Sequence, residues 1–185
     1  MNSSTKPYVN FDAMKNTIDA VRQQPQLGKV SFSMQSQSMG GLALSSQTGP
    51  LTQDTEVDDS RRGKFTLVSD EPVGLLGTDL GVSPAEYILK GLAGCYAVTL
   101  VSIAASKDIQ LDEIKLDLYF DIDLNGFLGI DPSVRNGAQG IRVDVQLTSE
   151  GTSRENLDEL VQLLPQRSPI HDTLANPVNI ATRLI

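Results

Sequence analysis

The segment between residues 83 and 106 constrains the fold of this chain more than any other. Its apolar residues fall on all sides of a helix, and a helix that is apolar all round is buried. Ser83 and Glu86 fit a capping box with a proline between them, which predicts that a helix begins there. The sequence therefore predicts a fold built around one buried central helix, and this helix contains the only cysteine, Cys95.

Apolar residues around this helix follow helix and strand periods. We expect a helix over residues 10–24, either a loosely attached amphipathic extension or an integral core helix. Thr152 to Glu155 resembles a second capping box and predicts another helix. Alternation of apolar and polar residues predicts strands. Residues 30–34, 42–44 and 65–67 are expected to form an antiparallel meander with one solvent-exposed face. Residues 114–122 and 141–147 are expected to form a hairpin, and residues 178–184 a last strand. This order predicts an α+β domain.

Composition and charge exclude several classes of function. The net charge is -8 and aromatic residues make up 5% of the chain, so nucleic acids and anionic membranes are not expected partners. The longest nearly uncharged run, 91–106, is shorter than the roughly 20 residues that cross a bilayer. The N-terminal residues lack the apolar core of a signal peptide. One cysteine and one histidine cannot build a structural zinc site. We expect a soluble, cytoplasmic protein without metal or cofactor.

Five short motifs resemble the OsmC/Ohr family of osmotically induced and organic-hydroperoxide-resistance proteins. The motifs are Asp70-Glu-Pro72, Leu75-Leu-Gly-Thr78, Ser83-Pro-Ala-Glu86, Gly91-Leu-Ala-Gly-Cys95 and Ser168-Pro-Ile-His-Asp-Thr-Leu174. The resemblance covers residues 28–185 and leaves residues 1–27 as an N-terminal helical extension. It implies an intertwined homodimer, with the central helices packed together and the sheets outside. Gly91 and Gly94 agree with such close packing.

The resemblance also implies a chemistry. In the best-understood family members a peroxidatic cysteine on the central helix attacks a hydroperoxide, and a resolving cysteine then closes a disulfide. Cys95 occupies the first position, but Ser168 stands at the second. The resemblance also implies a glutamate that assists the first step. In the Ohr-type branch of the family this glutamate occupies the position of Ala85, whereas other branches carry their acid at the position of Glu86. This chain therefore cannot complete the two-cysteine cycle.

Each candidate site residue has a functional and a structural interpretation. Cys95 is either a nucleophile or a buried packing residue. A reactive Cys95 needs a positive neighbour, because it lies roughly 17 Å from the helix start, beyond the reach of the helix dipole. The family arginine is assigned to Arg62, with Arg61 and Arg167 as alternatives, all of which are otherwise surface charges.

The remaining candidates lie around the thiol motifs. Glu86 is a catalytic acid or only a capping residue. His171 is a base near the thiol or a surface loop residue. Ser168 and Tyr96 are assigned to the substrate pocket, Ser168 with a simpler interpretation as a cap.

Three functions follow from these residues. The first is a one-cysteine hydroperoxide reductase or redox sensor, in which Cys95 is oxidised to a sulfenic acid and regenerated by an external thiol. The second is a non-catalytic dimeric protein that binds small apolar molecules, with Cys95 in the wall of its pocket. The third is a cysteine hydrolase, which requires a hydrogen bond between Cys95 and His171.

Overall fold

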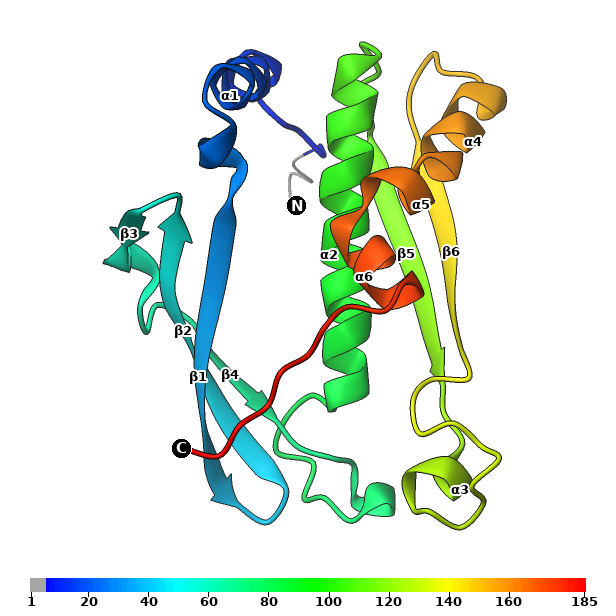
Figure 1. The fold of residues 1–185 in the computed structure, drawn as a ribbon. Coiled ribbons are helices and arrows are strands. Elements are labelled where there is room, and N and C mark those ends of the chain that lie inside the picture. Colours follow the sequence, from blue (N-terminus) through cyan, green and yellow to red (C-terminus); the bar gives the residue numbers. More distant parts are fainter. Residues whose placement is uncertain (1–5) are drawn as a thin grey trace, which may run out of the picture. The chain divides into compact units, whose positions relative to one another are not determined.

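A computed structural model describes residues 6–185. The helices are α1 (Phe11–Gln23), α2 (Pro84–Ser106), α3 (Leu124–Phe127), α4 (Arg154–Gln162), α5 (Leu164–Arg167) and α6 (Pro169–Ala175), with 3-10 turns at Pro25–Gly28, Asp59–Arg61 and Val73–Leu75. The strands are β1 (Val30–Gly40), β2 (Ala43–Gln53), β3 (Glu56–Asp58), β4 (Thr66–Ser69), β5 (Glu113–Asp121) and β6 (Gly140–Thr148) (Figure 1). Residues 1–5, on which part of the signal-peptide argument rests, lie outside the described residues.

The chain divides into two compact units. We call Met1–Phe11 with Ile88–Ile185 the core unit, and Asp12–Tyr87 the strand unit. Each contains its own antiparallel sheet, so the predicted α+β class with a long central helix and antiparallel sheets is confirmed. The prediction that an extension ends at residue 27 stays a prediction.

The core unit is a hairpin covered on one face by helices. β5 and β6 pair in register from Glu113 opposite Thr148 to Asp121 opposite Gly140, which places alternate apolar residues on one face. These side chains pack against the buried residues of the helices. Figure 1 shows α2 and α4 beside this hairpin. The helical residues are Leu92, Tyr96, Leu100 and Ala104 of α2, with Leu157, Leu160 and Leu164 of α4 and α5. The predicted strands 114–122 and 141–147 are thus confirmed.

Helix α2 begins with the predicted capping box. The Ser83 N–H donates to the Glu86 carboxylate at 2.8 Å, and the Glu86 N–H donates to Ser83 Oγ at 3.2 Å. These bonds satisfy two of the N–H groups that a helix start leaves open. The helix runs for 23 residues and is long and apolar enough to cross a bilayer, longer than the uncharged run suggested. The central helix of a soluble protein meets the same criteria.

The strand unit is a four-stranded antiparallel sheet. β2 pairs with β1 along one edge, and with β4 and then β3 along the other. Gly40 ends β1 and Gly41 begins the hairpin turn, with φ values of 105° and 56°, which favour glycine. The meander is confirmed, although β3 was not predicted and Phe65 lies just before β4. One expectation is wrong for the isolated chain, because every residue of β1 is exposed instead of alternating.

α1 contains no buried residue, and its interpretation as an extension stays a prediction. Three further differences have local causes. α4 is capped by Ser153, which accepts from the Asn156 N–H, whereas Thr152 bonds to Ser149. The alternation over residues 178–184 does not form a strand, since the segment pairs with no described strand. His171 lies in a helix and not in a loop, because Ser168 caps α6.

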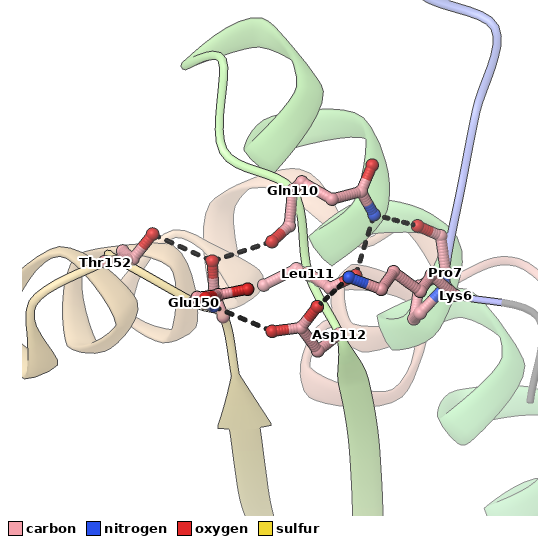
Figure 2. Close-up of polar contacts among 8 residues, drawn as sticks. Lys6, Pro7, Gln110, Leu111, Asp112, Glu150 and Thr152 are labelled. Carbon is pink, nitrogen blue, oxygen red and sulfur yellow. Dashed lines mark hydrogen bonds and ion pairs between the residues drawn. The ribbon is translucent and has the colours of Figure 1, made fainter.

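The N-terminal segment before α1 is attached to the start of β5. Lys6 forms an ion pair with Asp112, and the Pro7 carbonyl accepts from Gln110 Nε2 at 2.9 Å. Asp112 also accepts from the Glu150 N–H at 2.7 Å, as Figure 2 shows. The Lys6 ammonium lowers the pKa of the Asp112 carboxyl, and Asp112 raises the pKa of Lys6. These contacts join the segment to the turn between β6 and α4.

Candidate functional site

The site lies inside the core unit, where α2 meets the start of α6. Cys95 and Tyr96 are consecutive residues of α2, so their side chains point in directions about 100° apart around the helix. Tyr96 is 6% exposed, while Cys95 is partly exposed and is the only free cysteine. The helix therefore directs one side chain into the core and leaves a thiol at its edge.

Ser168 provides the polar contact of the thiol. It is 2% exposed and caps α6, with its Oγ accepting the His171 backbone N–H at 3.2 Å. The same Oγ lies 3.1 Å from Cys95 Sγ and donates to it. A serine hydroxyl has a single proton, and here that proton points at the sulfur. The sulfur is thus a hydrogen-bond acceptor for a buried hydroxyl.

Tyr96 and His171 form a second polar pair beside the first. The Tyr96 hydroxyl lies 2.6 Å from His171 Nδ1, and the two rings stack with an interplanar angle of 16°. Burial raises the pKa of the Tyr96 phenol, and the neighbouring Cys95 sulfur adds to this effect. A neutral phenol keeps its proton, so the geometry suits a hydroxyl that donates to the imidazole.

The structure brings four of the predicted site residues together: Cys95, Ser168, Tyr96 and His171. The prediction that Ser168 is a cap is confirmed by its bond to the His171 N–H. Cys95 receives its hydrogen bond from Ser168, and Nδ1 of His171 is engaged with Tyr96. The described hydrogen bonds therefore do not contain the cysteine–histidine pair that a hydrolase requires.

The predicted charged residues have local partners in the strand unit. Glu86 belongs to the capping box, as its structural interpretation predicted. Arg62 forms an exposed ion pair with Asp59 at 2.8 Å, and Arg61 lies over the Phe65 ring. Such a surface ion pair contributes little to stability and is easily broken. The assignment of Arg62 and Glu86 to catalysis stays a prediction.

Arg167 is the candidate arginine that lies within the core unit. It directly precedes Ser168 and lines an open cavity of about 530 Å³ along α2, together with Val98, Ser102 and Lys107. Among residues 6–185 no group of three histidine, cysteine or acidic side chains is arranged to hold a metal ion.

Asp70 has a role that the sequence did not reveal. This carboxylate is 1% exposed and accepts from the Thr78 hydroxyl at 2.7 Å and from the backbone N–H groups of Glu71, Thr78 and Leu80. The Thr78 hydroxyl, assisted by these N–H groups, lowers the pKa of Asp70 to about 2. Asp70 thus holds the loop before α2, and the Asp70-Glu-Pro72 motif was the available signal.

Comparison with known proteins identifies the family. The sequence profile of the OsmC-like proteins matches residues 77–183, more than half of the chain. The protein therefore belongs to the OsmC-like family, as the motifs predicted. None of the curated proteins compared with the chain matches it.

Solved structures share the fold at low sequence identity. An OsmC-like protein from Mycoplasma pneumoniae is 18% identical with a TM-score of 0.61, covering 78% of this chain and 87% of its own. The organic hydroperoxide resistance protein OsmC from Legionella pneumophila is 16% identical, with a TM-score of 0.56 and coverages of 78% and 88%. OhrB of Bacillus subtilis, an organic hydroperoxide resistance protein, is 20% identical, with a TM-score of 0.50 and coverages of 77% and 88%.

Proposed function

We propose that this protein is a one-cysteine, thiol-dependent hydroperoxide reductase of the cytoplasm that acts on organic hydroperoxides in a stress response. The hydrogen bond that Ser168 donates to Cys95 Sγ carries the proposal. A packing cysteine needs no buried donor directed at its sulfur, whereas a nucleophilic thiolate is stabilised by one. The partial exposure of the Cys95 residue supports access of a peroxide to it.

The first step consumes the hydroperoxide. The Cys95 thiolate attacks the terminal oxygen of ROOH, so that an S–O bond forms and the O–O bond breaks. The sulfur becomes a sulfenic acid, and the leaving alkoxide takes a proton from solvent to give the alcohol ROH. The Ser168 hydroxyl can donate a hydrogen bond to the sulfur before the attack and to the sulfenate afterwards.

The second step needs a reductant from outside the chain. A serine at position 168 cannot form a disulfide, so an external thiol attacks the sulfenic sulfur, releases water and forms a mixed disulfide. A second thiol then displaces Cys95 and leaves with the first as an oxidised disulfide. Without such a thiol Cys95 would stay oxidised, and the protein would serve as a redox sensor.

We further propose that the working form is the homodimer that the family resemblance implies. The exposed apolar side chains of β1 and the open surface beside Gly91 and Gly94 support it. A second copy of the chain would then supply Arg62 as the positive neighbour of the thiolate. Glu86 would be the acid that assists the first step.

Turnover of hydroperoxide tests this function. We expect purified protein with an excess of a dithiol to reduce an organic hydroperoxide catalytically, and Cys95→Ser to abolish turnover. Ser168→Ala, which keeps the cysteine, is expected to slow the first step by roughly ten- to hundredfold, since a hydrogen bond to a charged group contributes about 1.5–3 kcal/mol. Equal turnover by the wild type and Cys95→Ser would disprove the proposal. In that case the alternative function, a dimeric protein that binds small molecules without catalysis, would replace it.

A further inference from the structure

A small cavity of about 230 Å³ lies in the core unit between three elements. Each element contributes one face: Leu92 and Tyr96 from α2, Ile141 and Val143 from β6, and His171, Leu174 and Ala175 from α6. The spacing of these residues follows the helix and strand periods, so the cavity is a product of the regular packing. Cys95 is not among the residues that line it.

The wall of this cavity is apolar except for one polar pair. Tyr96 and His171 are the residues of the lining that carry side-chain hydrogen-bonding groups, and they bond to each other through the phenol and Nδ1. Ligand sites commonly have this composition, with apolar walls and a few polar groups that orient the ligand.

The Tyr96–His171 bond determines what the imidazole can offer to a ligand. The hydroxyl–Nδ1 contact fits either direction of the hydrogen bond, and we assign Tyr96 as the donor and Nδ1 as the acceptor because Nδ1 is the described acceptor within reach of the phenol. In a neutral imidazole the proton then resides on Nε2. This N–H is left without a described partner, since the contacts of the ring are those with Tyr96. We infer that this N–H is the hydrogen-bond donor that His171 presents to the cavity it lines.

We propose that this cavity binds an uncharged small molecule that has an apolar body and one acceptor, such as a carbonyl oxygen, bonded to His171 Nε2. A carboxylate of the same size would lose its hydration in an apolar cavity and would be repelled by the chain's net charge of -8. Cys95 does not line the cavity, so binding at His171 requires no reaction at Cys95.

The single histidine makes the site directly observable. We would label the histidine ring nitrogens of the full chain and follow their NMR signals during titration with a six-carbon methyl ketone. The proposal predicts a saturable change of the Nε2 signal, with hexanoate binding at least roughly tenfold more weakly at neutral pH. The absence of a saturable change up to the solubility of the ketone, or equal binding of hexanoate, would overturn it.

Two variants on α6 test the location. Ala175→Phe places a ring in the cavity and is expected to abolish ketone binding, whereas Thr173→Phe adds the same ring at an exposed position of the same helix and is expected to preserve it. His171→Phe should weaken binding, measured on ligand signals, by roughly two- to tenfold, the effect of one net hydrogen bond. Equal binding by Ala175→Phe and Thr173→Phe would contradict the location, and unchanged binding by His171→Phe would contradict the donor.

Discussion

The core unit and the strand unit bury their apolar residues to very different degrees. In the core unit Leu100 and Leu160 are both 0% exposed, and the described buried apolar residues lie there with the exception of Ala43. In the strand unit Phe32 is 79% exposed and Met34 is 51% exposed. One unit covers its own hairpin with helices, whereas the other leaves the apolar side chains of β1 exposed.

This difference distinguishes the apolar surface that the chain buries by itself from the apolar surface that only another molecule could bury. A large exposed apolar surface usually marks an interaction site. The candidate site lies wholly in the self-covered unit, so its geometry depends on the chain's own packing. The proposed homodimer would cover exposed β1 of the strand unit and the glycine face of α2 in the core unit.

The largest expected effect comes from the core unit. Leu160→Ala removes a fully buried side chain from between α4 and the hairpin, and we expect it to lower the free energy of unfolding by about 2–5 kcal/mol. The matched substitution is Phe32→Ala in β1. We expect the free energy of unfolding that it removes to depend on protein concentration and to be larger where the protein is fully dimeric. Urea unfolding at two protein concentrations measures both. If Phe32→Ala lowered the free energy of unfolding equally at both protein concentrations, the idea that a second copy covers β1 would be contradicted.

Within the strand unit the Asp70 carboxylate accepts hydrogen bonds from four groups of its own loop. Its pKa in the folded chain, about 2, is below the ordinary value of 3.8, so the charged form is stabilised by folding. This stability is present above about pH 4 and is lost as the pH falls toward 2. We expect Asp70→Asn to be less stable at pH 7 and to lose less stability in that interval. Asp79→Asn, an exposed change in the same loop, serves as the control, and thermal unfolding between pH 2 and 7 is the measurement.

Gly94 tests the open side of α2. A Cβ at this position meets no described atom within 4 Å, so Gly94→Leu should leave the fold of the core unit intact. If central helices pack closely in a dimer, the same change should weaken dimerisation by roughly tenfold or more through overpacking. Sedimentation at several concentrations decides between these outcomes. An unchanged dimer would show that the glycine face is not the interface.

Much of the core unit could be predicted from the sequence because its signals are local. The strict alternation in β5 and β6 and the Ser83–Glu86 capping box each depend on residues a few positions apart. The Asp70 network and the Tyr96–His171 pair could not be predicted, because they depend on contacts between residues distant in the sequence or on backbone N–H groups of a folded loop. The alternation at 178–184 was misleading, since a strand also needs a partner strand.

The smallest expected effect concerns the attachment of the N-terminal segment. The Lys6–Asp112 ion pair is partly exposed, so Lys6→Ala should change thermal stability only slightly, and the difference should vanish in high salt. A large, salt-independent loss of stability would mean that the segment of Figure 2 supports the core unit in another way.

The most direct test of the central claim compares two oxidised proteins by mass. Treatment of the wild type with one equivalent of an organic hydroperoxide should add one oxygen atom at Cys95, which a sulfenic-acid reagent then traps. Ser168→Cys places a second sulfur where Oγ now lies 3.1 Å from Sγ, so the same treatment should instead remove two hydrogens and form a disulfide. A wild-type Cys95 that stays unmodified until the protein unfolds, together with an unbridged Ser168→Cys variant, would contradict the account.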